Sequence, residues 1–216
     1  MLVDYSLYLV TDRSMLNGAS LMEAVEAAIK GGVTLIQLRE KDVSSSDFYS
    51  IAVELKQLAN SYQVPLIIND RLDIALAADA DGLHIGQEDI PLAVARKILG
   101  PGKILGYSVS NLAEAEYGMK HGADYLGAGP VYHTGSKVVA FDPIGTSILK
   151  NIKDIVSIPV VGIGGIGMSN IREVKNSGID GVSVISAILA SQEIETAARE
   201  LKNAWSEKIK YNLMQI

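Results

Sequence analysis

Residues 64–89, VPLIINDRLDIALAADADGLHIGQED, contain two short apolar runs that each end in polar residues. The runs cover residues 65–69 and 82–85, and the stretch between them has the length of a short helix. A strand, a helix and a second strand in this order indicate a βαβ unit with parallel strands. The fold therefore depends on how often this unit is repeated along the chain.

The same alternation extends in both directions from this stretch. Apolar, β-branched runs occupy residues 5–11, 34–39, 65–69, 82–85, 104–108, 125–128, 160–163 and 181–185. Between the first two runs, Leu21, Val25 and Ile29 share one helical face, and Ser20 and Glu23 have the spacing of a capping box. A similar helical stripe follows the last run and consists of Ile194, Ala197, Ala198, Leu201 and Trp205.

Eight strand–helix units predict an α/β protein with one domain, a closed (β/α)8 or TIM barrel over residues 1–216. An open flavodoxin-like sheet needs about five or six units and would leave about two or three apolar strands unused. No linker or low-complexity stretch interrupts the series. Residues 129–145, after the sixth strand, are long enough to form a lid, and residues 206–216 form a polar tail.

Charge and composition exclude several classes of protein. The 19 basic and 25 acidic residues give a net charge of -6, which argues against nucleic acid as a partner. The absence of cysteine excludes disulfides and thiolate catalysis and fits a reducing, cytoplasmic setting. Neither a secretory signal nor about 18 consecutive apolar residues occurs, so we expect no membrane partner. A homo-oligomer is compatible with these features.

Polar residues gather where the predicted strands end. In a TIM barrel, the carboxyl ends of the strands and the loops after them carry function, whereas the opposite rim serves stability. The residues at these ends are Gln37, Arg39, Glu40, Lys41, Asn69, Asp70, Arg71, Gly86, Gln87, Glu88, Asp89 and Ser108. We expect all of them to converge on one mouth of the barrel.

Asp70 and Asp89 close two neighbouring strands and are predicted to approach each other. Two carboxylates at short range repel unless a cation lies between them. Mg²⁺ fits best, because it is usually held by one or two carboxylates together with water and substrate phosphate. The alternative is that each aspartate caps the helix after it, near Leu72 and ahead of Pro91.

Positive charge is available on the same rim. Arg39, Lys41 and Lys137 suit a diphosphate whose other charges face the metal, although each one taken singly is an ordinary solvated charge. The histidines at 84, 121 and 133 are too scattered in sequence for a metal cluster. We expect His84 in the core and His133 in the lid.

A second anion site is indicated by the last two units. Gly162, Gly164 and Gly165 follow the seventh strand, and Ile185 and Ser186 begin a short helix after the eighth. This is the common phosphate position of TIM barrels, where glycines allow backbone N–H groups to approach an anion. The alternative is that the glycines only turn the chain.

Six motifs, in a fixed order, resemble those of thiamine phosphate synthases. They are QLREK (37–41), NDR (69–71), GQED (86–89), GADYLGAGPV (122–131), GIGGI (162–166) and DGVSVIS (180–186), and the resemblance spans residues 8 to about 205. It implies a transferase of thiamine biosynthesis. That family joins 4-amino-2-methyl-5-(diphosphooxymethyl)pyrimidine to the nitrogen of 4-methyl-5-(2-phosphoethyl)thiazole, or its carboxylated form, and releases pyrophosphate.

The resemblance implies two substrate sites and one metal site. The pyrimidine diphosphate site comprises Gln37, Leu38, Arg39, Glu40, Lys41, Asn69, Ser108 and Lys137. The thiazole phosphate site comprises Thr134, Gly135, Ser136, Gly165, Ile185 and Ser186. The Mg²⁺ ligands are Asp70 and Asp89. The candidate catalytic residues are Arg39, Lys41, Ser108 and Lys137.

The lid departs from the family pattern. Where the family commonly has proline-threonine-x-threonine-lysine and then an aspartate, this chain has His133, Thr134, Gly135, Ser136, Lys137 and then Val139. Serine in place of threonine keeps the hydroxyl. The histidine in place of proline frees the backbone, and Val139 removes an acid, so both changes bear on lid closure.

Two other functions share part of these features. A sister family with the same barrel isomerises or aromatises the thiazole phosphate, but its pattern lacks the paired aspartates and has a histidine where this chain has Pro130. A barrel that senses a phosphorylated precursor without catalysis would need the phosphate site but no magnesium pair. Asp70, Asp89 and Pro130 therefore favour the synthase, while His133 keeps the isomerase open.

A dissociative mechanism is predicted from the groups that the sequence lacks. There is no cysteine and no evident histidine–serine pair, and the attacking thiazole nitrogen has no proton for a general base to remove. We expect pyrophosphate to leave first and to produce a pyrimidine methylene cation. Mg²⁺, Arg39, Lys41 and Lys137 would stabilise the leaving group, while Gln37 holds the pyrimidine.

Overall fold

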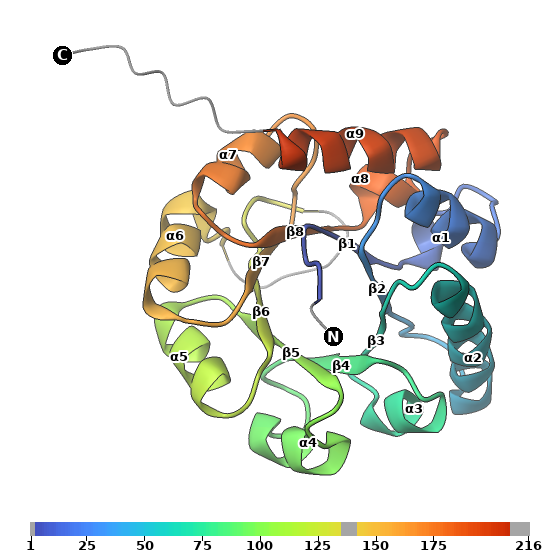
Figure 1. The fold of residues 1–216 in the computed structure, drawn as a ribbon, viewed down its shortest axis with the longest axis horizontal. Coiled ribbons are helices and arrows are strands. Elements are labelled where there is room, and N and C mark those ends of the chain that lie inside the picture. The colour runs from blue at the N-terminus through green and yellow to red at the C-terminus, as the bar shows by residue number, and fades with distance from the viewer. Residues whose placement is uncertain (1–2, 135–141, 208–216) are drawn as a thin grey trace.

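The computed structural model describes residues 3–134 and 142–207, which form a closed barrel of parallel strands inside a ring of helices (Figure 1). The strands follow sequence order around the barrel, and the last pairs with the first. They are β1 (Leu7–Val10), β2 (Leu35–Leu38), β3 (Leu66–Asn69), β4 (Gly82–Ile85), β5 (Ile104–Val109), β6 (Tyr125–Ala128), β7 (Val160–Ile163) and β8 (Gly181–Val184). The predicted (β/α)8 barrel is confirmed.

The helices lie outside the strands and alternate with them along the chain. They are a 3-10 turn η1 (Arg13–Met15), then α1 (Leu21–Lys30), α2 (Ser45–Ser61), α3 (Leu72–Ala77), α4 (Leu92–Leu99), α5 (Leu112–Lys120), α6 (Gly145–Ile155), α7 (Ile171–Asn176), α8 (Ser186–Leu189) and α9 (Ile194–Ser206). Within the described part of the chain, no helix has both the length and the apolar character needed to cross a membrane.

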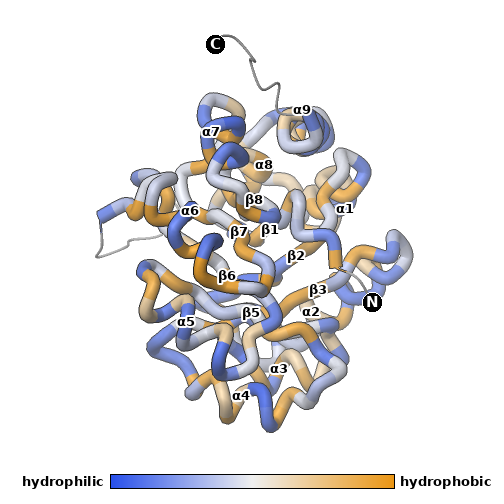
Figure 2. The backbone as a smooth tube through the Cα atoms, turned by 60° about the vertical axis from the view of Figure 1, so that its left-hand side comes forward, coloured by the Kyte–Doolittle hydropathy of each residue, from blue (hydrophilic) through white to orange (hydrophobic). Residues whose placement is uncertain are grey.

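The predicted start of α1 is present in the structure. The backbone N–H of Glu23 donates to Ser20 Oγ at 3.1 Å, and the Glu23 carboxylate accepts from the backbone N–H of Ser20 at 3.4 Å. This capping box supplies partners for two backbone groups that a helix leaves unpaired at its start. The apolar face that follows, with Leu21, Val25 and Ile29, is buried against the barrel. In Figure 2, hydrophobic and hydrophilic stretches alternate along the outer helices.

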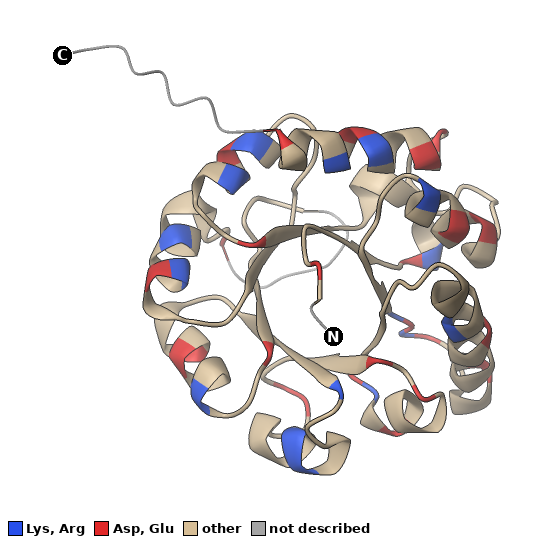
Figure 3. Ribbon diagram, viewed as in Figure 1, with Lys and Arg blue, Asp and Glu red and all other residues tan. Residues whose placement is uncertain are grey.

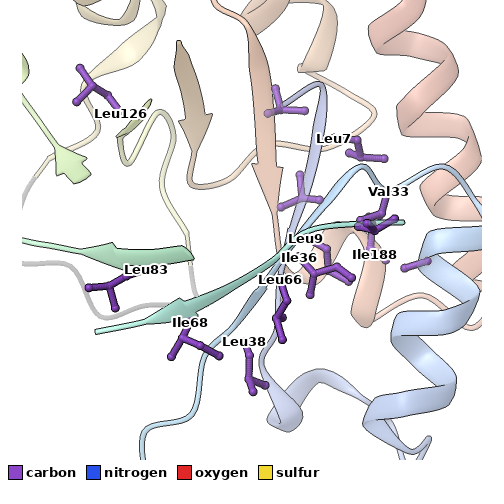
Figure 4. Close-up of a cluster of buried hydrophobic side chains, with 14 of the residues drawn as sticks. Leu7, Leu9, Val33, Ile36, Leu38, Leu66, Ile68, Leu83, Leu126 and Ile188 are labelled. Atoms are coloured by element: carbon purple, nitrogen blue, oxygen red, sulfur yellow. The ribbon is translucent and has the colours of Figure 1, made fainter. Parts of the chain in front are cut away.

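Alternation along the strands divides the apolar core into two layers. The outward side chains, such as Leu9, Ile36 and Leu66 of three neighbouring strands, pack beneath the helices (Figure 4). The inward side chains form a separate buried cluster inside the barrel, which consists of Tyr8, Leu35, Ile67, Tyr125 and Val161. Because successive side chains of a strand point to opposite faces, a short apolar run supplies both layers at once.

The barrel has an open end and a filled end. We call the end at the amino termini of the strands the lower mouth, and the end at their carboxyl termini the upper mouth. The segment before β1 crosses the lower mouth, at the centre of Figure 1, and Val3 and Tyr5 pack against the inner cluster there. The Tyr5 ring lies 5.0 Å from that of Tyr125, centroid to centroid. A ligand that enters the barrel therefore has to come from the upper mouth.

Charged residues lie mainly on the helices and at strand ends, as the colours of Figure 3 show. At the lower mouth, an aspartate just before β4, β6 and β8 accepts a hydrogen bond from a backbone N–H of the preceding strand. These aspartates are Asp81, Asp124 and Asp180, which pair with Lys56, Arg96 and Lys153 of the outer helices. In the first case, Asp81 Oδ2 accepts from the backbone N–H of Leu66 at 2.8 Å and from Lys56 Nζ at 2.6 Å. Each aspartate thus joins two strands and one helix.

Replacing the first of these aspartates should destabilise the barrel. Asp81→Ala leaves the Leu66 N–H and the largely buried Lys56 ammonium without their partner, so we expect the free energy of unfolding to fall by about 1–3 kcal/mol. Urea denaturation measures this loss. The matched control is Asp42→Ala, because the Asp42 side chain is exposed, and its loss should change the free energy by less than about 0.5 kcal/mol. Equal effects of the two substitutions would contradict the role given to Asp81.

Candidate active site

A pocket of about 1060 Å³ opens at the upper mouth, where the strand ends converge. Most of the described candidate residues line it, namely Gln37, Arg39, Lys41, Asn69, Asp70, Asp89, Ser108, Thr134, Gly165, Ile185 and Ser186. Three further candidates, Gly135, Ser136 and Lys137, lie outside the described residues, as does Val139. The structure brings residues from both ends of the chain into one cavity, and their binding roles stay predictions.

Two predicted contact residues, Leu38 and Glu40, are not among the residues that line this pocket. Gln37 of β2 faces the barrel interior, so the next side chain, Leu38, faces the helices, where it is fully buried. Glu40 does not line the pocket either, and its Oε2 accepts from Arg13 Nε at 3.0 Å. Leu38 can therefore meet a ligand only through its backbone.

The two predicted metal ligands do not act as helix caps. Residue 71, an arginine, precedes α3, and Pro91 precedes α4; neither helix start receives a side-chain hydrogen bond. Instead, Asp70 Oδ2 accepts from Lys41 Nζ at 2.7 Å, and Asp89 Oδ2 accepts from the backbone N–H of Gly86 at 2.7 Å. The capping alternative is not observed, and both carboxylates are turned toward the pocket.

The backbone at Asp70 helps to aim its side chain. Its φ of 62° lies in the left-handed region, which aspartate tolerates better than most residues. The backbone N–H of Asp70 donates to the carbonyl oxygen of His84, at 2.8 Å, which extends the pairing of β3 and β4 by one step. The position of Asp70 is thus fixed by the strand beside it.

The two carboxylates disfavour each other's charge. Burial raises the pKa of Asp89, and the nearby Asp70 carboxylate raises it further, while the Gly86 N–H and Lys41 act in the opposite direction. A divalent cation between the carboxylates would remove this repulsion. No set of three or more metal-binding side chains occurs in the described residues, so a bound ion would keep positions for water and phosphate. That donor set fits Mg²⁺.

Positive charge borders the carboxylates on one side. Lys41 is half-exposed and pairs with Asp70, as described above. Arg39 Nη1 lies 3.4 Å from Asp12 Oδ2, and the backbone N–H of Arg39 donates to Thr11 Oγ1 at 3.0 Å. The guanidinium is therefore held at the pocket wall rather than in bulk solvent. This side of the pocket can accept an anion with several charges.

The opposite side of the pocket is built from the two glycines after β7. Gly164 and Gly165 have φ values of 100° and 65°, which glycine adopts without steric cost. A Cβ at Gly165 would lie 2.6 Å from the carbonyl oxygen of His133, so this position also allows the loop after β6 to pack closely. Two backbone hydrogen bonds hold that loop. The N–H of Val131 donates to the carbonyl oxygen of Ile163 at 2.8 Å, and the N–H of Tyr132 donates to that of Gly164 at 3.0 Å.

Several pocket residues had not been predicted from the sequence. They include Tyr8, Asn111, Glu114 and Ser183. His84 is buried in the core, as expected, with a hydrogen bond at each ring nitrogen, but it also lines the pocket. The signal that could have found Tyr8 is its place inside an apolar run, because a buried tyrosine hydroxyl needs a polar partner.

Neutralising one of the paired carboxylates should stabilise the metal-free protein. Folding raises the pKa of Asp89, so its ionised form opposes folding at pH 7, and this penalty disappears as the pH falls below the pKa of the unfolded chain. We expect Asp89→Asn to raise the melting temperature at pH 7 in EDTA but not near about pH 3.5. Scanning calorimetry provides the measurement.

Two comparisons make this result specific. Asp42→Asn changes an exposed aspartate that does not line the pocket and should leave the melting temperature unchanged. Added Mg²⁺ should stabilise the wild type more than Asp89→Asn. A lower melting temperature for Asp89→Asn in EDTA at pH 7 would show that the carboxylate is a structural group and not one of a repelling pair.

Comparison with known proteins covers nearly the whole chain. A family model described as thiamine monophosphate synthase matches residues 7–188. Proteins named thiamine-phosphate synthase from Desulfitobacterium hafniense and Clostridium novyi are 60% and 53% identical, over 95% and 93% of this chain and 99% and 98% of their own lengths. The solved thiamine phosphate pyrophosphorylase from Pyrococcus furiosus is 41% identical, with a TM-score of 0.85 over 94% of this chain and 96% of that one. The chain belongs to the thiamine monophosphate synthase family.

Proposed function

We propose that this protein is a transferase that joins the aminopyrimidine methyl diphosphate to the thiazole phosphate and so forms thiamine phosphate and pyrophosphate. The relatives that share most of its length are named for this activity. The observation that carries the proposal is the pocket at the upper mouth, which places paired carboxylates and basic side chains opposite a glycine-rich turn. A reaction between two phosphorylated substrates needs two such anion sites in one cavity.

The pyrimidine diphosphate is assigned to the side of the pocket formed by β2 to β5. Gln37 and Ser108 present neutral polar groups from the barrel interior, which suit the pyrimidine ring, and Asn69 lies between them on β3. The diphosphate would extend outward to Arg39 and Lys41. Lys137, outside the described residues, is assigned to the same anion by family resemblance.

Asp70 and Asp89 would hold the magnesium ion that the diphosphate requires. Their proximity and the raised pKa of Asp89 support a cation between them. When bound, Mg²⁺ supplies positive charge to the oxygens of the leaving diphosphate. Lys41, already in contact with Asp70, would add a second positive charge on the same side.

The thiazole phosphate is assigned to the turn after β7 and the start of α8. The first backbone N–H groups of a helix have no partner within it, and Ser186, the first residue of α8, also has a hydroxyl at the pocket wall. Gly165 allows the backbone there to approach a phosphate closely. Thr134 lines the same side, and Gly135 and Ser136 are assigned to it by family resemblance.

We infer that the pyrophosphate leaves before the thiazole nitrogen attacks. The described pocket offers no cysteine. It does contain a histidine–serine pair that the sequence had not indicated, His84 Nε2 and Ser108 Oγ at 2.9 Å, but the attacking nitrogen has no proton for a general base to remove. The chain's own contribution is then positional and electrostatic: Arg39 and Lys41 stabilise the charge on the leaving group, and the walls hold the two substrates in line. A pyrimidine methylene cation would be the intermediate.

The activity is tested by supplying both substrates. We expect the protein with Mg²⁺ to produce thiamine phosphate, detected by its mass, and to lose this activity in EDTA. Asp70→Asn should lower the rate at limiting Mg²⁺ because it removes one of the two ligands. If no coupled product forms while the carboxylated thiazole phosphate alone is converted to its aromatic form, the activity is that of the sister family.

The phosphate end of the pocket is tested separately. Ser186→Ala removes one hydroxyl that would bind the thiazole phosphate, so calorimetry should show its dissociation constant rise by about fivefold to tenfold. Affinity for the pyrimidine diphosphate should not change. Ser191→Ala is the control, because Ser191 lies beyond the end of α8 and does not line the pocket. Unchanged affinity for both substrates in Ser186→Ala would refute this placement.

A further inference from the structure

Five side chains form a continuous chain of hydrogen bonds across the barrel interior. Gln37 Nε2 donates to the Tyr8 hydroxyl at 2.6 Å, and the hydroxyls of Tyr8 and Tyr125 are 2.8 Å apart. The Tyr125 hydroxyl lies 2.8 Å from His84 Nδ1, and His84 Nε2 lies 2.9 Å from Ser108 Oγ. We call these five residues the polar relay. Its central bonds join residues 117 and 41 positions apart in sequence.

The relay runs beneath the pocket and reaches it at both ends. Gln37 and Ser108 line the pocket from β2 and β5, and Tyr8 and His84 form part of its floor. Tyr125 is fully buried below them. A change in the middle of the relay can therefore affect the groups that meet a ligand, although Tyr125 itself does not line the pocket.

The neighbouring strands leave space for the relay. A Cβ at Gly106 would overlap both His84 Nδ1 and the Tyr125 hydroxyl, and a Cβ at Gly127 would lie 3.0 Å from His84 Cε1. Neither glycine has a positive φ, so backbone conformation does not explain them. Glycine is present at both positions because the relay side chains occupy the volume that any other side chain would fill.

Each hydroxyl in the relay has one proton to donate, and this fixes the direction of the chain. Burial raises the pKa of both Tyr8 and Tyr125, so both phenols stay protonated. Because Tyr8 accepts from Gln37, its single proton is left for Tyr125, and the proton of Tyr125 is then left for His84 Nδ1. A neutral imidazole that accepts at Nδ1 has its proton on Nε2 and donates it to Ser108.

The direction of the relay determines what each end offers to a ligand. The amide nitrogen of Gln37 is engaged with Tyr8, so its carbonyl oxygen is the group available as an acceptor. Ser108 accepts from His84, so its hydroxyl proton is available as a donor. Reversing this pattern would require the Gln37 amide to flip and every proton between the two ends to change sides. Any partial reversal leaves a buried donor without an acceptor, which is costly.

We propose that the polar relay fixes the hydrogen-bond pattern at the pocket floor and thereby selects a 4-aminopyrimidine over its 4-oxo analogue. This specificity rests on the proposed function. An aminopyrimidine offers N–H donors on the exocyclic amine and acceptors on its ring nitrogens, which complements an acceptor at Gln37 and a donor at Ser108. The 4-oxo analogue offers a carbonyl acceptor and a ring N–H instead. Tyr8, Tyr125 and His84 are positioning residues in this scheme.

The test compares two pyrimidine diphosphates that differ only in the 4-amino or 4-oxo group. Tyr125→Phe and Tyr8→Phe each remove one relay hydroxyl while they keep the ring, and Tyr107→Phe is the control, because Tyr107 packs outside the barrel interior. We expect the wild type to bind the amino compound more tightly. In each relay variant the ratio of the two dissociation constants, measured by calorimetry, should fall by about tenfold, since one fixed hydrogen bond is lost.

Other measurements separate this role from a general structural one. The KM for thiazole phosphate should stay the same in both relay variants, and Tyr107→Phe should keep the wild-type ratio. If both relay variants fold and bind the two pyrimidines with the wild-type ratio, the proposal is overturned, whatever their rates. If one variant does not fold, the other decides.

The same experiment distinguishes failure of the relay from failure of the proposed function. Wild-type protein that forms thiamine phosphate, together with relay variants that keep full discrimination, would leave the function standing and refute the relay. Wild-type protein that forms no product but binds the amino compound preferentially, with loss of that preference in Tyr125→Phe, would refute the function and support the relay.

Discussion

Closure of the eight strands into a barrel is the constraint on which the other features depend. Because side chains alternate along each strand, every strand sends residues inward and outward in turn. The inward positions near the lower mouth are apolar, with Tyr8, Leu35 and Tyr125 in one buried cluster. The inward positions one step higher include Gln37 and Ser108, which line the pocket. The same alternation thus places a packed inner cluster near the lower mouth and polar side chains at the bottom of the pocket.

The two rims of the barrel use aspartate in opposite ways. At the lower rim, Asp81 has both a backbone N–H and a lysine as partners, and Asp124 and Asp180 repeat the arrangement, so negative charge there stabilises the fold. At the upper rim, Asp70 and Asp89 face each other, and the pKa of Asp89 is raised by burial and by its neighbour. A repelling pair is tolerated at the upper rim because the two apolar layers and the lower rim hold the barrel together.

Three residues of the upper rim have left-handed backbone conformations. Asp70, Gly164 and Gly165 all have positive φ values, and all three line the pocket. The turn after β7 is held by two backbone hydrogen bonds from the loop after β6, so it is fixed even though it is not part of the sheet. Precise placement of binding groups on a rigid scaffold is what a reaction between two bound substrates requires.

The sequence by itself determined the number and order of the strands, the start of α1 and the residues that stand at strand ends, because alternation, helical period and capping are local patterns. It also indicated that Asp70 and Asp89 form a pair, but it left open whether they cap helices. The structure answered this question, because Arg71 and Pro91 are the residues at the helix starts. Only the tertiary structure showed that Tyr8 meets Tyr125 across 117 residues. Such a contact depends on the register in which the barrel closes, and register is a property of all eight strands together that no local pattern contains.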